Sequence, residues 1–232
     1  MGDLDDLNDL DFMDDFGIFD DEDDNDNDAA PDVVPVAQDG TAVCMASRLR
    51  LATRRANSEH QLDEVLDWDL KDGVAYHVLS LGDIDALTYV RAIVRAHPAD
   101  YVLLSTWCMG KADVAELRGW IEKGYIKRLD MYVGEIFKSN YPEVYSELLD
   151  FVPKTGGRVA MFRNHAKTSL VAARDGLRAV VTSSANMNTN PRHEVTVISV
   201  SAELFDFYKR FYDGIKPFNK RGVPKNWTPW TE

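Results

Sequence analysis

Residues 158–200 read RVAMFRNHAKTSLVAARDGLRAVVTSSANMNTNPRHEVTVISV, and they hold the clearest pattern of strands and turns in the chain. Its apolar runs predict four strands, at 158–162, 167–173, 177–182 and 194–200. Arg174-Asp175-Gly176 separates the second run from the third, and Asp-Gly is a strong signal for a tight hairpin. The stretch therefore predicts a run of neighbouring strands that ends with a helix over residues 202–212.

Before residue 158 the sequence alternates strand and helix patterns. We expect an edge strand at 47–55, a buried strand at 74–80, and further strands at 101–107 and 128–137. Expected helices cover 58–69, a segment from the N-cap Asp83 to Pro98, 111–123 and 142–151. Such alternation is typical of a parallel sheet with helices on both faces. Together with the hairpin, it predicts an α/β fold with a mixed, largely parallel sheet.

The charge of the chain is concentrated at its N-terminus. Residues 1–28 hold 14 of the 39 acidic residues and no Lys or Arg, which leaves 25 acids against 26 bases in the remainder. Self-repulsion and low hydrophobicity predict that residues 1–40 form a disordered tail. Leu4, Leu7, Leu10, Met13 and Phe16 recur every three residues, so the tail is either a solubilising segment or a peptide that docks on a partner or on a basic groove of its own chain.

The rest of the composition narrows the class of protein. We expect a folded domain at 41–215 and a basic, Trp-containing extension at 216–232. The two cysteines, Cys44 and Cys108, have no metal-type spacing, so neither a disulfide framework nor a metal site is expected. The acidic N-terminus does not resemble a signal peptide, and no apolar run is long enough to span a membrane. These features predict a cytoplasmic protein.

His165 and Lys167 carry the chemistry of residues 158–200. Residues i and i+2 of an extended segment point to the same face, so an imidazole and an ammonium lie side by side. The imidazole is suited to attack phosphorus while the ammonium neutralises the phosphate oxygens. Ser183, Ser184 and Asn186 follow as hydroxyl and amide groups that suit further contacts to a phosphate.

This pattern resembles the His-x-Lys half-site of the phospholipase D superfamily, over roughly residues 74–213 and most specifically over 164–194. The resemblance implies a nucleophilic His165, a phosphate-binding Lys167, Ser184 and Asn186 holding the same phosphate, and a Glu194 that orients His165. Asn188 and Arg192 lie in the same loop as further candidates for contacting substrate. Glu135, at a strand end, is a weaker candidate and is read mainly as a loop acid.

One position departs from the superfamily pattern. The Asp expected five residues after Lys167 is replaced by Ala172, and Asp175 lies three residues further on. The chain is thus either a diverged active member or a binding-only relative. Because hydrolysis in the superfamily uses two half-sites and this chain has one, the resemblance implies a homodimer that works without a metal or another cofactor.

The substrate predicted from these features is DNA. Two basic clusters suit a nucleic acid better than a lipid: Arg48, Arg50, Arg54 and Arg55, and then Lys216, Lys220, Arg221 and Lys225. Phe218, Trp227 and Trp230 accompany the second cluster and are either base-stacking residues or part of the core. The leading hypothesis is a metal-independent nuclease. The alternatives are a catalytically silent nucleic-acid-binding or adaptor protein and a transferase of the same chemistry.

Overall fold

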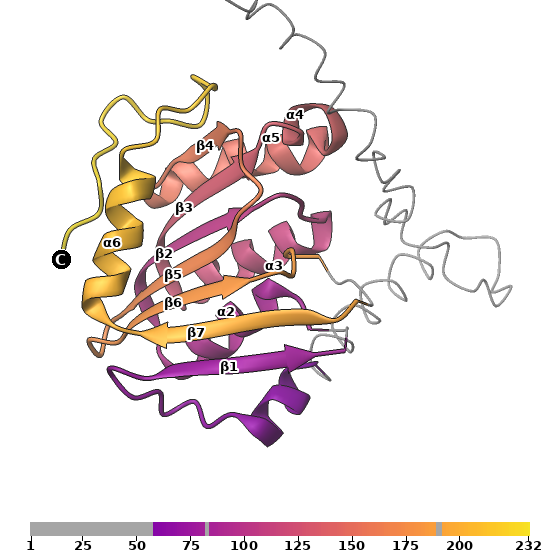
Figure 1. Cartoon of the computed structure of the whole chain (residues 1–232). Helices are drawn as coiled ribbons and strands as arrows, with labels where there is room; N and C mark the ends of the chain where they lie inside the picture. Colours follow the sequence, from indigo (N-terminus) through magenta and orange to yellow (C-terminus); the bar gives the residue numbers. More distant parts are fainter. Residues whose placement is uncertain (1–57, 82–83, 189–191) are drawn as a thin grey trace, which may run out of the picture. The chain divides into compact units, whose positions relative to one another are not determined.

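The fold is a seven-stranded sheet in the order β1-β7-β6-β5-β2-β3-β4, seen in a computed structural model that describes residues 58–81, 84–188 and 192–232 (Figure 1). The strands are β1 Ala75–Ser80, β2 Ala99–Thr106, β3 Ile126–Gly134, β4 Val159–Phe162, β5 Lys167–Ala173, β6 Arg178–Ser183 and β7 Glu194–Val200. The prediction of a mixed α/β sheet is confirmed. The expected strand at 47–55 and the acidic tail lie outside the described residues.

Parallel pairing is confined to one half of this sheet. β3 pairs in parallel with β2 and with β4. The other pairs are antiparallel: β5 with β2, β6 with β5, β7 with β6, and β1 with β7. The β5–β6 hairpin closes at Gly176, which has a φ of 97°, and Leu177 N donates to Asp175 Oδ1 at 3.2 Å. Most strands therefore share one direction, as expected, but most neighbouring pairs are antiparallel.

Helices cover both faces of the sheet, as predicted. Their bounds are α2 Ala86–Ala96, α3 Lys111–Glu122, α4 Phe137–Asn140, α5 Pro142–Phe151 and α6 Ala202–Asp213, and residues 58–65 are also helical. Figure 1 shows α6 on one face and α2, α3 and α5 behind the other. Asp85 is the N-cap of α2, and its Oδ1 accepts from Thr88 N at 2.7 Å. The expected cap, Asp83, lies outside the described residues.

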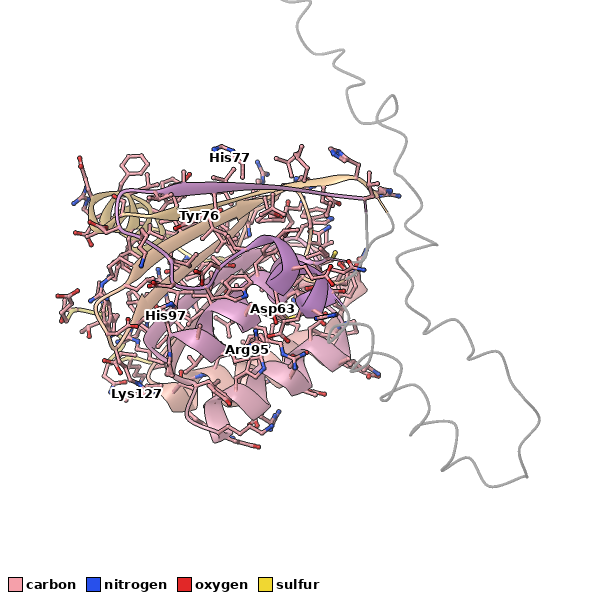
Figure 2. The ribbon with its side chains drawn as sticks, turned by 90° about the horizontal axis from the view of Figure 1, so that it is seen from below. Asp63, Tyr76, His77, Arg95, His97 and Lys127 are labelled. Atoms are coloured by element: carbon pink, nitrogen blue, oxygen red, sulfur yellow. The ribbon has the colours of Figure 1, made fainter. Side chains whose placement is uncertain are left out.

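The prediction that the strand at 74–80 is buried is wrong. β1 forms the edge of the sheet and pairs only with β7 in the described chain. Figure 2 shows Tyr76 turned toward the body and His77 on the outer side of β1, where Leu79 is 69% exposed. An apolar run does not reveal whether a second layer covers it, and α6 packs on β5, β6 and β7 instead.

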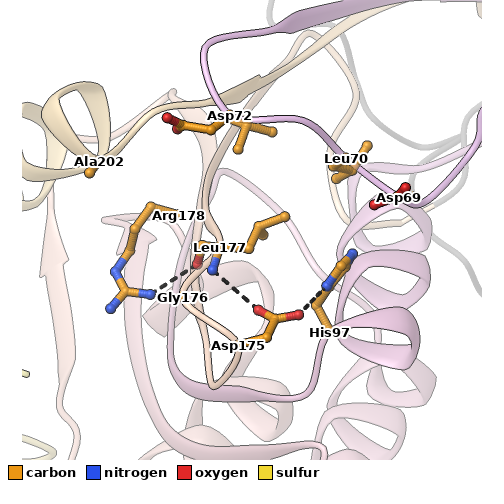
Figure 3. Close-up of a pocket in the computed structure, with 10 residues that line it drawn as sticks. Asp69, Leu70, Asp72, His97, Asp175, Gly176, Leu177, Arg178 and Ala202 are labelled. Atoms are coloured by element: carbon orange, nitrogen blue, oxygen red, sulfur yellow. Dashed lines mark hydrogen bonds and ion pairs between the residues drawn. The ribbon is translucent and has the colours of Figure 1, made fainter.

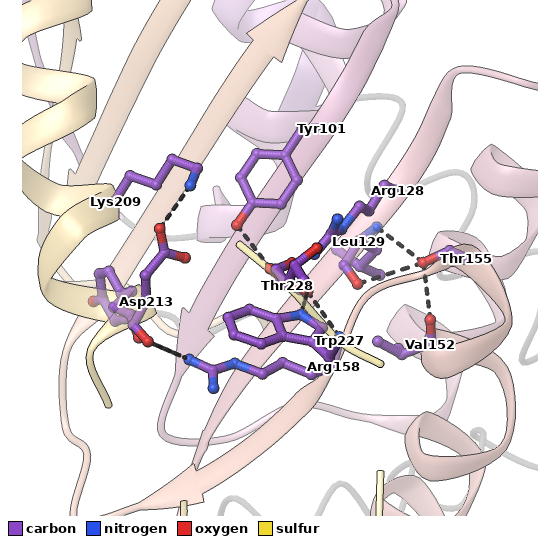
Figure 4. A network of polar contacts seen from close by, with 12 residues as sticks. Tyr101, Arg128, Leu129, Val152, Thr155, Arg158, Lys209, Asp213, Trp227 and Thr228 are labelled. Carbon is purple, nitrogen blue, oxygen red and sulfur yellow. Dashed lines mark hydrogen bonds and ion pairs between the residues drawn. The ribbon is translucent and has the colours of Figure 1, made fainter. Parts of the chain in front are cut away.

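The C-terminal extension packs on the face that carries α6. The Trp230 ring stacks on Tyr101 with centroids 5.0 Å apart, and Trp227 lies 3.7 Å from the Arg158 guanidinium. Trp227 also donates its Nε1 to Asp130 at 3.2 Å, within the polar network drawn in Figure 4. Burial raises the pKa of Asp130, which is fully enclosed. Both tryptophans therefore belong to the packed structure, whereas Phe218 is 61% exposed.

No helix in the described part of the chain is long and apolar enough to span a bilayer.

Candidate active site

The candidate site lies where several strands end at one edge of the sheet. Lys167 begins β5 and pairs with Ser183, the last residue of β6, which in turn pairs with Thr196 of β7. Glu194 begins β7 and pairs with Ser80, the last residue of β1. Because paired residues of antiparallel strands project to the same face, Lys167, Ser183 and Glu194 share the face that α2 covers.

His165 lies at the opening of this site. It is exposed in the loop between β4 and β5, and Lys167 Nζ is 3.2 Å from its Nδ1 and 3.3 Å from its Nε2. The Trp107 ring also neighbours the imidazole, 5.2 Å away between centroids and tilted by 53°. The predicted pairing of one imidazole with one ammonium is thus present, although His165 precedes the strand instead of lying on it.

The electrostatics of the pair favour the neutral form of the imidazole. Partial burial lowers the pKa of His165, and the adjacent Lys167 charge lowers it further. Burial also lowers the pKa of Lys167, while the nearby Cys108 and Glu194 act in the opposite direction. A neutral imidazole retains the lone pair that a nucleophile needs, and Lys167 is a cation within reach of the same substrate atom.

Asn164 holds the loop that carries His165, a role that was not evident in the sequence. Its buried amide nitrogen lies 3.0 Å from Ser105 Oγ, 3.3 Å from Thr106 O and 3.2 Å from Tyr132 O. Its Oδ1 accepts from Ala166 N at 3.0 Å. The only sequence signal was an Asn directly before His165, at the end of a strand.

Gly134 and Glu135 complete the support of this loop. A Cβ on Gly134 would lie 2.9 Å from the Trp107 ring and 3.0 Å from Asn164 O, so only glycine lets the ring and the loop approach β3 so closely. Glu135 Oε2 accepts from Asn164 N at 3.3 Å. Glu135 therefore supports the loop backbone, in line with its interpretation as a loop acid.

Glu194 is directed at Ser184 in this structure. Its carboxylate accepts a hydrogen bond from the Ser184 hydroxyl, and Ser184 Oγ also accepts from Val195 N at 3.0 Å. Among the described residues no hydrogen bond joins Glu194 to His165. The charge of Glu194 still acts on Lys167, so the two groups belong to one site without direct bonding.

The other predicted residues divide between partnered and open groups. Ser183 Oγ bonds Thr196 Oγ1 at 2.7 Å, and Asn188 Oδ1 accepts from Cys108 Sγ at 2.9 Å. Asn186 Oδ1 is buried without a hydrogen-bond partner in the described chain, while the main-chain oxygen of Asn186 accepts from Ala86 N. Arg192 is exposed. Asn186 thus keeps unused hydrogen-bonding capacity at a buried side-chain oxygen.

The motif's missing Asp is not replaced from elsewhere in the hairpin. Ala172 is buried in the apolar layer under α6, on the opposite face from Lys167. Asp175 lies past the far end of β5, where its Oδ2 is 2.5 Å from His97 Nδ1 (Figure 3). Since β5 separates Asp175 from His165, this carboxylate serves a different part of the sheet.

Within residues 58–81, 84–188 and 192–232, no group of three or more His, Cys, Asp or Glu side chains is arranged to hold a metal ion.

Comparisons with known proteins return fold-level likenesses only. No protein-family description and no curated protein matches the chain. Among solved structures, the chain is similar to Nuc from Salmonella typhimurium, a phospholipase D family member, at 13% identity and a TM-score of 0.45 over 60% of this chain and 91% of Nuc. It is also similar to the polyphosphate kinase of Porphyromonas gingivalis, at 16% identity and 0.44 over 63% of this chain and 27% of the kinase.

A third similar structure is TrmBL2, an archaeal chromatin protein with a novel mode of DNA binding, at 8% identity and 0.43 over 72% of this chain and 62% of TrmBL2. TM-scores below 0.5 support no conclusion about the chemistry of this chain.

Proposed function

We propose that this protein is a metal-independent phosphodiesterase, a nuclease that acts on DNA through a phosphohistidine intermediate. The observation that carries the proposal is the exposed His165 imidazole with the Lys167 ammonium 3.2 Å away, at an open end of the sheet. The lowered pKa of His165 favours the unprotonated ring that the attacking copy needs, while the second copy supplies the protonated one. The pair combines a free nucleophile with a fixed positive charge for the phosphate oxygens.

The proposed reaction has two steps. A ring nitrogen of His165 attacks phosphorus and forms a P–N bond, while the P–O bond to the leaving oxygen breaks and a second histidine gives that oxygen a proton. Water then attacks the phosphohistidine, the same second histidine takes its proton, and the P–N bond breaks. Lys167 neutralises the charge on the phosphate oxygens in both steps, and Glu194 supports the His165–Lys167 pair. The proposed substrate contacts are Ser183, Ser184, Asn186, Asn188 and Arg192.

The second histidine is proposed to come from a second copy of the chain. Leu79 and Val195 pair across β1 and β7 and are 69% and 43% exposed on the sheet face opposite Glu194, and Leu81, just past the end of β1, is 89% exposed. An exposed apolar patch at the strand ends that also hold the incomplete site suits a two-fold interface, because one patch then covers itself and brings the same strand ends of two copies together. We call Leu79, Leu81 and Val195 the edge patch.

Leu79→Glu tests the dimer. The variant is expected to sediment as a monomer in analytical ultracentrifugation and to lose DNA cleavage, because a buried, unpaired charge opposes association. Val65→Glu is the matched control, since Val65 is 74% exposed on the helix at residues 58–65. An unchanged dimer in the Leu79 variant, or a monomeric wild type that cleaves, would contradict the shared site.

Cleavage of single- and double-stranded DNA in EDTA tests the chemistry. The wild type is expected to cleave in the chelator and His165→Ala to be inactive. His60→Ala, which changes an exposed histidine elsewhere, is expected to retain full activity. Trapping a phosphorylated His165 by rapid quench and mass spectrometry identifies the intermediate, and turnover that survives in His165→Ala rules it out.

A nucleic-acid-binding protein without turnover is the second candidate. It is favoured by one observation: the carboxylate that the motif lacks at Ala172 is not supplied by Asp175, which is bonded to His97 instead. In that case His165→Ala is expected to leave DNA affinity unchanged, and no condition of the cleavage assay gives product.

The acidic N-terminal segment is proposed to act as a competitor for DNA. Its 14 acids within 28 residues complement the basic C-terminal cluster. Docking on a partner protein is the other proposed role for this segment.

A further inference from the structure

A pocket lies beside β4, lined by none of the described residues that contact His165. Its volume is about 500 Å³, within the usual size range of ligand pockets. Three cations, Lys138, Lys220 and Arg221, line it, and no acidic residue does; the other lining residues are Pro142, Tyr145, Ser146, Leu149, Met161, Phe218 and Asn219. We call it the basic-aromatic pocket.

The cations of this pocket are not paired with any described acid at contact distance, although the charge of Arg221 also acts on Asp150. Lys138, Lys220 and Arg221 are exposed, and in the described chain none of them forms an ion pair. The acids of the adjoining helix α5 are each paired elsewhere: Glu143 with Lys111, Glu147 with Arg118 and Asp150 with Lys154. The positive charge of the pocket therefore remains available to an anion from solution.

The segment that presents two of these cations is fixed to the edge of the sheet. Phe218 N donates to Met161 O at 2.8 Å, and Val159 N donates to Gly222 O at 2.8 Å. Asn219 bridges the same strand, with Nδ2 donating to Val159 O at 2.8 Å and Oδ1 accepting from Met161 N at 2.7 Å. Gly222 has a φ of 86°, a conformation that favours glycine.

These bonds hold Lys220 and Arg221 at a set position instead of on a free tail. A preorganised segment loses less conformational entropy when it binds a ligand than a free one does.

An exposed aromatic ring completes the pocket. Phe218 is 61% exposed and stacks on no other ring in the described residues, unlike Trp230 on Tyr101. Tyr145 also lines the pocket, where the Arg221 charge offsets part of the rise that burial causes in the pKa of Tyr145. A ring that can stack on a base and cations that can meet a phosphate are the two elements of single-strand recognition.

The chain connects the pocket closely to the candidate active site. Met161, in the pocket, precedes His165 by four residues, and a chain of that length spans at most about 14 Å. Lys138 follows Glu135 by three residues, and Glu135 is bonded to Asn164. Both connections place the pocket within a few nucleotides of His165.

We propose that the basic-aromatic pocket binds one nucleotide of a single-stranded DNA whose cleaved phosphate lies at His165, with the base on Phe218 and phosphates on Lys138, Lys220 and Arg221. This inference rests on the proposed function, because it takes DNA as the substrate. It adds a preference for single strands, since a base paired in a duplex cannot stack on Phe218.

Fluorescence anisotropy with a labelled 15-nucleotide dT strand tests the proposal. All variants carry His165→Ala in the full chain, so that the probe stays intact and binding is measured independently of cleavage. Phe218→Ala is expected to weaken binding about 10-fold, and Phe218→Trp to retain it. Lys220→Ala with Arg221→Ala is expected to reduce the slope of log affinity against log salt by roughly 1.4, from two phosphate contacts at about 0.7 each.

Matched controls separate the pocket from general charge and surface area. Phe211→Ala removes a ring that is 65% exposed on α6, and Lys71→Ala with Lys127→Ala removes two exposed cations elsewhere. Circular dichroism melting curves check that each variant is folded. An abasic strand is expected to bind with the same affinity whether or not the protein carries Phe218→Ala, because it has no base to stack.

The proposal is overturned if the pocket variants bind like the controls, or if Phe218→Ala weakens the abasic strand as much as the dT strand. Tight binding of the mononucleotide dTMP with the same dependence on Phe218 would also overturn it, in favour of a site for free nucleotides. A wild type without cleavage activity would refute the proposed nuclease while leaving this binding result in place, so the two failures are distinguishable.

Discussion

Replacing Asn164 is expected to destabilise the fold and the His165 loop together. The two amide hydrogens of Asn164 can satisfy two of the three oxygens that surround them, and its Oδ1 accepts one further bond from Ala166 N. Three hydrogen bonds at about 1 kcal/mol each give a loss of about 3 kcal/mol for Asn164→Ala. Thr106 O and Tyr132 O are main-chain acceptors within strands, so we add no further loss of stability for leaving them without the Asn164 amide.

Asn164→Asp is expected to cost more than Asn164→Ala at pH 7. Ala166 N can still donate to one carboxylate oxygen. The other would face Ser105 Oγ, Thr106 O and Tyr132 O, of which only the Ser105 hydroxyl can donate. A buried charge without adequate partners costs about 3–5 kcal/mol, and protonation of the Asp at low pH relieves part of it. Both variants are expected to reduce cleavage about 100-fold, because a small displacement of His165 disturbs the attack geometry.

Urea unfolding followed by circular dichroism measures these free energies. Asn226→Ala, at an exposed position, is the control and is expected to lie within about 0.5 kcal/mol of the wild type. If Asn164→Asp is as stable as the wild type at pH 7, the assigned amide contacts do not hold the loop and the reasoning fails.

Three further predictions concern pH and the acidic segment. Because the His165 pKa is lowered, the acid limb of the kcat/KM profile is expected below about pH 6.5. Lys167→Gln is expected to raise the His165 pKa measured by NMR, and an unchanged pKa would mean that the Lys167 charge is screened. Burial alone would lower the pKa of His97, but its bonds to Asp175 and to Trp68 O raise it. The contribution of protonated His97 to the free energy of unfolding is therefore full below about pH 6.5 and is lost as pH rises through the higher pKa of the folded state. We expect His97→Gln to remove about 1 kcal/mol at pH 6 and little at pH 9 in thermal unfolding, and equal losses at both would contradict the ion pair. Deleting residues 1–40 is expected to raise single-strand affinity most at low salt, and an unchanged affinity excludes competition.

Much of the local structure could be predicted because it depends on neighbouring residues. The Asp175-Gly176 turn, the strand at Glu194–Val200 and the helix at Pro142–Phe151 follow from turn chemistry, apolar periodicity and a proline at the first helical turn. The approach of His165 to Lys167 was predictable from their spacing of two residues, although His165 lies in the loop before β5.

Other features depend on which segments become neighbours in the sheet. The exposed edge patch exists because the sheet order leaves β1 outermost, and the apolar sequence of β1 reads the same whether or not a layer covers it. Trp227 and Trp230 find Arg158 and Tyr101 only because the extension returns across the α6 face.

Sequence patterns predict every α-helix except the short α4, most strands, the hairpin, the acidic N-terminal segment and the His165–Lys167 pair; at α4 the expected strand at 128–137 gives way to a helix from Phe137. Tertiary structure alone decided that Asp175 bonds His97, that Asn164 anchors the His165 loop, and that residues 138, 161 and 218–221 form one pocket. The physical reason is range: turns and strand patterns arise from contacts between residues close in the chain, whereas these groups meet only after the sheet order has brought distant segments together.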